Sequence, residues 1–327
     1  MKKRNSPLVS IVVETNNLER PGLPSFHQMA KVHLAEARKS FKDREFEMLF
    51  VGENLPVLPR GARNYFCLNR PGTGYFGMKN EGAKAARGRY VVFWDSDCIA
   101  VRGYLSCAID RMEKDPGISA LAGVTRYDGP SFLTRLNTTL SFGYLFQGDD
   151  SLLKTWPPLG HNLVIRKDRF PSAPFGPHSG RTGGEWFFMR HLERFKRSLR
   201  VEPKMRIRHE DLSYSMPAYY DRHVRELIGP LVQRPSRSRL WVLFFAARSA
   251  AVLPWRRFQR LLQFGEKSGV RGLEIPFAIP VLLVYGLMDM AAVLAMVLNP
   301  TFLNRCLEHQ LGWEWVVANG FGSKPSA

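Results

Sequence analysis

Asp95 and Asp97 directly follow Tyr90–Trp94, a continuous apolar run rich in β-branched and aromatic residues. That composition predicts a buried strand. In open α/β sheets, ligands bind at the carboxyl ends of the strands. An Asp-x-Asp pair at this place can hold a hard divalent cation, which takes oxygen ligands and bridges phosphate oxygens. The alternative is structural, because Asp and Ser are also common turn and N-cap residues.

The elements that must position this pair alternate between strands and helices. Leu8–Val13 and Phe46–Val51 are predicted strands that end in polar or turn residues. Apolar residues at helical spacing predict an amphipathic helix over 25–41, and an Ala-rich helix is expected over 78–86. With a short strand over 65–68, the order is that of a doubly wound α/β sheet, which delivers polar residues at one edge.

The pattern continues beyond Asp97. We expect helices over 103–114, 132–142 and 185–195 and strands over 120–124, 160–165 and 201–209. Residues 173–184 form a Pro/Gly-rich loop before the last of these helices. We therefore predict one α/β domain over residues 1–215.

The composition narrows the class of protein. The chain has 327 residues, a formal net charge of +18 and four cysteines without a Cys-x-x-Cys pair. The charge favours polyanionic partners, and the cysteines fit thiols in a reducing compartment better than a disulfide framework or a zinc site. The first apolar run breaks at Glu14, too early for a signal-peptide core, so we expect the catalytic part in the cytoplasm.

Residues 216–327 have a different character, with Arg residues spread among apolar ones. Phe277–Leu298 is long and apolar enough to cross a bilayer. The alternative is that it and Leu240–Leu253 lie on, or dip into, the cytoplasmic leaflet, because Arg can snorkel toward headgroups. Pro276, Pro280 and Asp289 weaken a simple span. A soluble helical domain or an oligomer interface is the remaining alternative, but we predict a helical, membrane-associated region.

The ordered series of motifs resembles family 2 glycosyltransferases of the GT-A type. The resemblance covers roughly residues 8–210. In chain order, the motifs are a Thr-x-Asn turn after the first strand, an acidic turn after the second, a Gly-rich segment with Lys-Asn, the Asp-x-Asp signature, a Gly-x-Asn strand start, an acidic helix start and a late His. The resemblance implies a GT-A (Rossmann-like), mostly parallel sheet flanked by helices. It further implies an inverting transfer of sugar from a nucleotide diphosphate, with UDP as the expected nucleotide, to a saccharide or lipid-linked acceptor.

The resemblance also assigns roles to single residues. The chemistry needs a cation beside the diphosphate leaving group and a base near the acceptor hydroxyl, and a carboxylate at a helix N-terminus stays ionised for that task. The expected catalytic base is Glu185; the nucleotide-sugar-binding residues are Thr15, Asn17, Glu53, Lys79 and Asp95; Asp97 and His209 bind Mg²⁺ or Mn²⁺; and His161, Asn162 and Trp186 line the acceptor site.

Some positions depart from the family pattern. Gly52-Glu53 stands where two Asp are usual, Glu14 stands where Pro or a small residue is usual, and only Glu185 is acidic where Glu-Asp is usual. The assigned residues other than Asn162 also have structural alternatives, as turn residues, solvated acids, a surface lysine, helix-terminal charges or packed side chains. The rival functions are a catalytically degenerate GT-A-like protein and a non-enzymatic module that binds membranes or polyanions. The leading hypothesis is an enzyme at the cytoplasmic face of the cell membrane, attracted to its anionic surface, in polysaccharide or glycolipid synthesis. No nucleic acid is expected as a partner.

Overall fold

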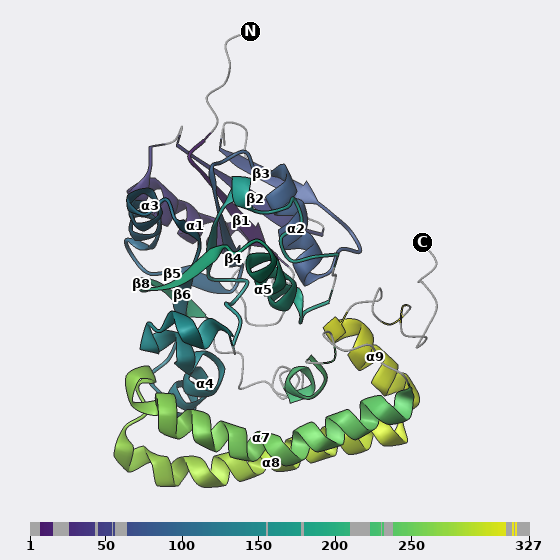
Figure 1. The fold of residues 1–327 in the computed structure, drawn as a ribbon. Helices are drawn as coiled ribbons and strands as arrows, with labels where there is room; N and C mark the ends of the chain where they lie inside the picture. Colours follow the sequence, from purple (N-terminus) through teal and green to yellow (C-terminus); the bar gives the residue numbers. More distant parts are fainter. Residues whose placement is uncertain are drawn as a thin grey trace. The chain divides into compact units, whose positions relative to one another are not determined.

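The computed structural model describes residues 7–15, 26–42, 45–53, 55, 64–154, 156–177, 180–209, 223–229, 231, 238–311, 316 and 318 (Figure 1). The chain divides into two compact units, each treated separately below. The first unit draws on Met1–Arg126, Gly148–Pro177 and Gly184–Glu210. The second draws on Tyr127–Gln147, His178–Gly183 and Asp211–Ala327. The predicted domain boundary at residue 215 stays a prediction.

An eight-stranded sheet in the order β3-β2-β1-β4-β7-β6-β8-β5 organises the first unit. The pairs β2–β3, β1–β2 and β1–β4 are parallel, and β4–β7, β6–β7 and β5–β8 are antiparallel. The predicted α/β fold is confirmed, with the parallel strands on one side of the sheet. The strands are β1 (Val9–Glu14), β2 (Phe46–Gly52), β3 (Tyr65–Asn69), β4 (Tyr90–Asp95), β5 (Cys98–Ala100), β6 (Ile118–Tyr127), β7 (Leu163–Arg166) and β8 (Ser198–His209).

Helices cover both faces of this sheet, which explains why β4 is apolar from Tyr90 to Trp94 and β1 from Ile11 to Val13. Ile11 and Val13 belong to a core cluster that includes residues of α1 (Phe26–Ser40) and α3 (Tyr104–Lys114). Val12 belongs to a second cluster with residues of α2 (Tyr75–Ala85) and α5 (Gly184–Arg194). Successive side chains of a strand point to opposite faces, so a strand buried on both sides reads as a continuous apolar run.

The predicted elements of this unit are confirmed with small shifts at their ends. The helix expected over 78–86 begins earlier, at Tyr75. The strand expected over 160–165 begins later, at Leu163. One strand was not predicted from the sequence: β5, three residues long at Cys98–Ala100, follows the Asp-x-Asp turn. The short helical turns of the unit are Asp150–Lys154 and Lys167–Arg169.

The described part of the second unit is helical. It contains α4 (Phe132–Phe142), the turn Gly143–Gln147, α7 (Arg239–Ser268), the turn Gly272–Glu274, α8 (Ile275–Leu298) and α9 (Pro300–Leu311). The long helices α7 and α8 pack side by side (Figure 1). Gly286 favours this close packing, because a Cβ there would lie only 3.0 Å from Pro254 Cγ of α7. Leu136 and Leu140 of α4 share a core cluster with residues of α7 and α8.

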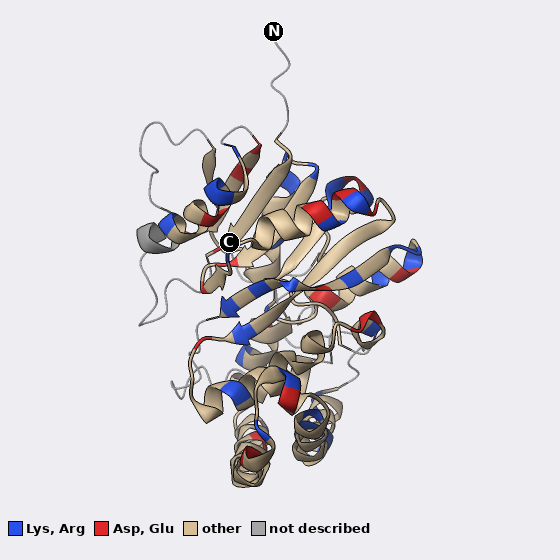
Figure 2. Cartoon of the chain, turned by 90° about the vertical axis from the view of Figure 1, so that its left-hand side faces the viewer, with Lys and Arg blue, Asp and Glu red and all other residues tan. Residues whose placement is uncertain are grey.

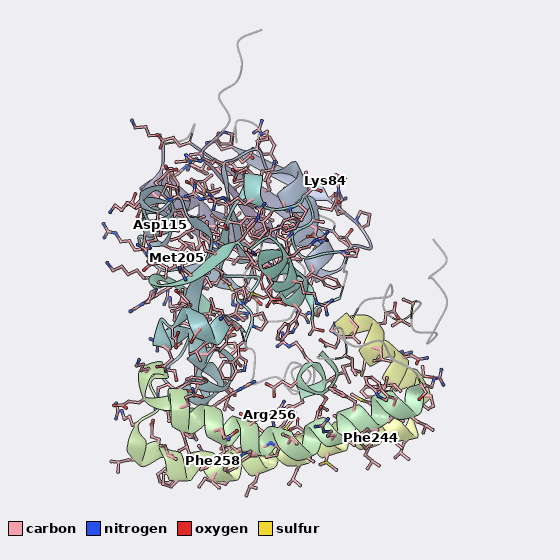
Figure 3. All side chains as sticks on the ribbon, viewed as in Figure 1. Lys84, Asp115, Met205, Phe244, Arg256 and Phe258 are labelled. Atoms are coloured by element: carbon pink, nitrogen blue, oxygen red, sulfur yellow. The ribbon has the colours of Figure 1, made fainter. Side chains whose placement is uncertain are left out.

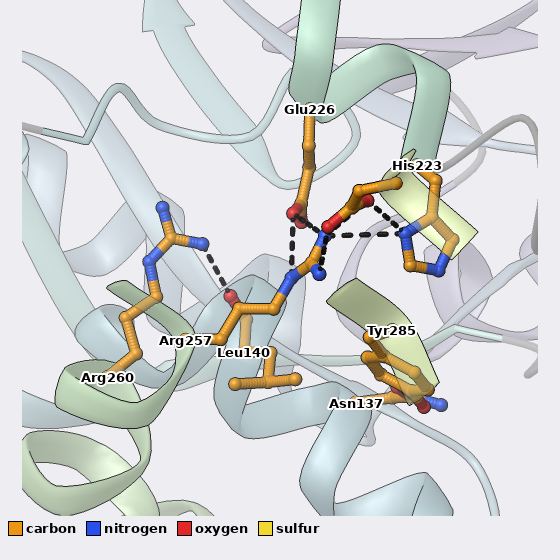
Figure 4. A network of polar contacts seen from close by, with 8 residues as sticks. Asn137, Leu140, His223, Glu226, Arg257, Arg260 and Tyr285 are labelled. Atoms are coloured by element: carbon orange, nitrogen blue, oxygen red, sulfur yellow. Dashed lines mark hydrogen bonds and ion pairs between the residues drawn. The ribbon is translucent and has the colours of Figure 1, made fainter. Parts of the chain in front are cut away.

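Charged side chains are buried between the helices of this second unit (Figure 4). Arg257 donates from Nη1 to Asp289 at 2.6 Å and from Nη2 to Glu226 at 2.7 Å. His223 Nδ1 lies 2.5 Å from Asp289 Oδ1. Asp289 is fully buried, so the one acidic residue of α8 faces its protein neighbours. The charge of Asp289 therefore does not prevent the outer face of α8 from contacting a membrane.

The outer face of α8 is a stripe of large apolar side chains that are exposed in the structure. Gly272–Leu298 is long and apolar enough to span a bilayer. Its most apolar window of 18 residues has a mean hydropathy of 2.3, and only 33% of that window is buried. On α7, Phe244 is exposed as well (Figure 3). Trp255 of the same helix is also exposed. Lys and Arg occur on elements of both units, so the positive charge is not confined to the C-terminal helices (Figure 2). The α8 stripe consists of Leu283, Leu287, Met290, Leu294 and Leu298.

Candidate active site

The Asp-x-Asp turn lies at the carboxyl end of β4, as the sequence predicts. Asp95 ends β4, and Asp95, Ser96 and Asp97 are all buried. The chain then turns into β5, whose first residue, Cys98, is the antiparallel partner of His209 at the end of β8. This pairing is what brings the late His to the acidic turn, although the two segments are far apart in the sequence.

The turn and β8 together form a group of side chains that could hold a metal ion. The ligand atoms of Asp95, Asp97, Cys98 and His209 all lie within 4.8 Å of one another. His209 Nε2 lies 3.6 Å from Asp97 Oδ1, and the Cys98 thiol donates to the same oxygen at 3.8 Å. An ion bound at about 2.0–2.3 Å separates opposite ligands by about 4–4.6 Å, so these residues fit a divalent cation. Burial, followed by the Asp97 and Asp95 charges, raises the pKa of Cys98 well above its usual value.

Asp95 has its own partners on α2. The Tyr75 hydroxyl donates to its Oδ2 at 2.8 Å, and Lys79 donates to Oδ1 in a buried ion pair. Tyr75 and Lys79 are four residues apart, so they lie on one face of the helix. Burial alone would raise the pKa of Asp95, but Lys79, with smaller contributions from His161 and His209, holds it below its usual value. Asp95 is therefore kept ionised and held in place.

Glu185 lies in the first turn of α5, beside this group. A Cβ on Gly184 would lie 2.5 Å from the Phe76 ring, so only glycine lets the start of α5 approach α2 this closely. Glu185 Oε1 accepts from the Gly160 backbone N–H at 3.5 Å. A Cβ on Gly160 would lie 3.6 Å from Glu185 Oε1 and 3.7 Å from Lys79 Cε. Gly160 therefore lies close to both the Glu185 carboxylate and the Lys79 side chain.

Tyr75 connects these groups electrostatically. Burial raises the pKa of Tyr75 well above its usual value, and the charges of Asp95, Glu14 and Glu185 raise it further, in that order. Three carboxylates from β1, β4 and α5 therefore act on one phenol. Tyr75 was not predicted from the sequence as a site residue. Its spacing could have indicated it, because a residue one helical turn before Lys79 lies on the same face of the helix.

Thr15 and Glu53 follow the neighbouring strands. Thr15 Oγ1 donates to the Val51 carbonyl at 3.1 Å, and a Cβ on Gly52 would lie 1.7 Å from Thr15 Oγ1. This contact explains why glycine stands at Gly52. Glu53 is exposed and accepts from the Gly72 backbone N–H at 2.5 Å, which ties it to the next turn. Asn17 lies outside the described residues. Roles of these residues in nucleotide binding stay predictions.

The predicted acceptor residues differ in their surroundings. Asn162 is fully buried; its Oδ1 accepts from Tyr104 at 2.9 Å and its Nδ2 donates to Thr125 at 3.0 Å. Its amide therefore joins elements of the fold. His161 Nδ1 lies 3.8 Å from Asp95 Oδ2, and its ring lies 5.3 Å from that of His209. Trp186 is half-buried beside Glu185 on α5.

Residues 61–191 match the family model described as glycosyl transferase family 2. The matched segment contains Lys79, Asp95, Asp97 and Glu185, and the match supports the glycosyl transfer role that the sequence predicts. None of the curated proteins matches this sequence. Solved structures that match include the mannosyltransferase PcManGT from Pyrobaculum calidifontis, in complex with GDP-Man and Mn²⁺. It is 14% identical, the match covers 96% of this chain and 86% of that chain, and the TM-score is 0.49.

Proposed function

We propose that this glycosyltransferase moves a sugar from a nucleotide-diphosphate sugar to a hydroxyl group of a saccharide or lipid-linked acceptor, in cell-surface polysaccharide or glycolipid synthesis. The observation that carries the proposal is the group of ligand atoms from Asp95, Asp97, Cys98 and His209 at the end of β4, in a chain whose segment 61–191 matches the family. Asp97 and His209 would hold Mg²⁺ or Mn²⁺. When bound, the cation neutralises the charge that develops on the diphosphate leaving group.

Glu185 is proposed as the general base. Its carboxylate lies at the N-terminus of α5, where the helix dipole favours the ionised form. It would accept the proton of the acceptor hydroxyl as that oxygen attacks the anomeric carbon and the sugar–phosphate bond breaks. A single displacement with the base opposite the leaving group inverts the anomeric centre.

Lys79, Tyr75 and Asp95 are proposed to position the donor. Both carboxylate oxygens of Asp95 accept hydrogen bonds from the Tyr75 hydroxyl, and Lys79 donates to Oδ1. Held in this way, Asp95 would accept hydrogen bonds from the ribose or the transferred sugar. Thr15 and Glu53, at the ends of β1 and β2, are proposed to contact the nucleoside, with uridine as the expected base.

The experiment is turnover of UDP- and GDP-linked sugars with Mn²⁺ or Mg²⁺. Asp97→Ala and Glu185→Gln are each compared with wild type, and Glu193→Gln, an exposed carboxylate on the same helix, is the matched control. We expect both site variants to lower kcat by about 10²–10⁴-fold, and the control to keep wild-type turnover. Full activity of both site variants overturns the role assignments. Binding of UDP by wild type without turnover favours the catalytically degenerate alternative.

The C-terminal helices are proposed to hold the enzyme at the cytoplasmic face of the cell membrane. The supporting observation is the exposed apolar stripe of α8, which would lose contact with water in a bilayer interface. The excess of positive charge would add attraction to an anionic leaflet. A lipid-linked acceptor would be presented at the same surface.

A further inference from the structure

We propose that Cys98 is a ligand of the metal ion and that its sulfur makes the site prefer a transition-metal ion over Mg²⁺. This inference rests on the proposed function, because it concerns the cation that the transfer would use. It concerns a residue to which neither the family resemblance nor the sequence pattern assigns a role.

The strand pairing places the Cys98 side chain. Cys98 and His209 are register partners in the antiparallel pair β5–β8, and the side chains of such partners project from the same face of the sheet. Cys98 Sγ and His209 Nε2 lie 3.8 and 3.6 Å from the same atom, Asp97 Oδ1. A buried thiol, an imidazole and a carboxylate thus converge on one point.

The fourth member of the group is engaged elsewhere. Both Asp95 oxygens accept from the Tyr75 hydroxyl, and Lys79 places a positive charge on Oδ1. A cation that bound through Asp95 would have to approach this ammonium group and compete with its hydrogen bonds. The donor set that binding would use is therefore Asp97, Cys98 and His209.

This set provides one oxygen, one sulfur and one nitrogen atom. Mg²⁺ takes oxygen ligands and parts reluctantly with its water, whereas thiolate and imidazole ligands suit Zn²⁺ and other first-row transition metals. On binding, the Cys98 S–H bond breaks, its proton passes to solvent and a metal–sulfur bond forms. No electron is transferred and no further reactant is needed. Within the described residues, the other cysteines, Cys67, Cys107 and Cys306, lie outside the metal-binding group.

The test uses the full chain and Co²⁺ as a spectroscopic probe. Co²⁺ bound to a thiolate gives a near-ultraviolet charge-transfer band that Co²⁺ bound to oxygen and nitrogen alone does not give. We expect this band in wild type and in Cys306→Ser, a buried cysteine of the second unit, but not in Cys98→Ser. In parallel, thermal stabilisation is measured with Mn²⁺, Co²⁺, Zn²⁺ and Mg²⁺. Cys98→Ser should lower the affinity for Co²⁺ and Zn²⁺ by at least about tenfold, with a smaller effect on Mg²⁺.

The outcomes separate this inference from the proposed function. If Co²⁺ stabilises wild type without a thiolate band, Cys98 is not a ligand and the inference fails, while metal-dependent transfer can still be observed. If no metal stabilises wild type, the inference also fails, and sugar turnover in the presence of EDTA then tests the proposed function by itself. Circular dichroism shows whether Cys98→Ser folds. If the variant does not fold, a wild-type spectrum without the thiolate band still overturns the inference.

Discussion

Lys79 and Asp95 form an ion pair in which the lysine side chain is 0% exposed and the aspartate side chain is 4% exposed. The pair joins α2 to the end of β4, next to the turn that carries Asp97. Breaking a buried pair leaves one charge without compensation, which costs more than the pair contributes when intact. Lys79 therefore acts on the site through Asp95, and its position is fixed by the fold before any donor binds.

Lys79→Met should destabilise the protein by about 3–5 kcal/mol, because the Asp95 charge would stay buried without its partner. In the double variant Lys79→Met/Asp95→Asn the loss should be smaller than the sum of the two single losses. Urea unfolding of all four proteins gives the coupling free energy. Lys84→Met, an exposed lysine on the same helix, is the control and should change stability by less than about 0.5 kcal/mol (Figure 3). Strict additivity of the two single variants would contradict the expected coupling.

His33 should make stability depend on pH. Burial lowers the pKa of His33 from 6.5 to about 4, and its ring stacks on Trp94 at 5.0 Å. The unfolded chain takes up a proton at this residue as the pH falls through 6.5, whereas the folded chain does so only near 4. The neutral ring thus contributes stability that is present above pH 6.5 and is lost as the pH falls toward 4, by about 3 kcal/mol in total.

The measurement is the free energy of unfolding from pH 7 to pH 4 for wild type and His33→Phe, which keeps an aromatic ring against Trp94. The difference between the two proteins should shift in favour of the variant over this range. His191→Phe, a half-buried histidine on α5, should show no such shift. Parallel pH profiles of wild type and His33→Phe would rule out the effect.

Arg257→Met should destabilise the second unit strongly, by about 3–5 kcal/mol, because Asp289 would remain buried without its main positive partner. Arg256→Met changes the neighbouring, exposed arginine and should have little effect (Figure 3). Thermal unfolding and limited proteolysis, read at sites within α7 and α8, distinguish the two. Equal sensitivity of both variants would mean that the buried network contributes little.

The outer stripe of α8 should decide membrane binding. Leu283→Asp, Leu287→Asp and Leu294→Asp, combined in one variant, place charges on exposed positions without touching the buried face. Flotation with vesicles containing phosphatidylglycerol should recover wild type with the vesicles and leave the variant in solution. Phe195→Asp, an exposed aromatic of the first unit, is the control. Co-flotation of the triple variant at the wild-type level would argue against the stripe as the binding face.

The sequence predicted the long, periodic elements well, because the period of their apolar residues is set by burial. It also predicted that Asp95 and Asp97 end a buried strand. The sequence could not predict β5, because a strand of three residues is too short to show a periodic pattern. The pairing of β5 with β8, which places Cys98 opposite His209, could therefore not be predicted either. Lys79 was expected to contact phosphate or base, and only the packing of α2 shows that its ammonium group turns to Asp95. Gly52 departs from the family pattern, and the structure gives the reason: the Thr15 side chain occupies the space that a Cβ at residue 52 would need.

The interleaving of the two units has a practical consequence for anyone who shortens this chain. Residues 127–147 belong to the helical unit although strands of the sheet precede and follow them. Leu136 and Leu140 of α4 pack on Leu261 and Leu282, and Tyr285 donates to Asn137 at 3.1 Å. A truncated chain that stops after β8 would lack these neighbours, and the apolar side chains of α4 would be exposed to water. Expressed alone, such a fragment should aggregate unless α4 is rebuilt with polar residues.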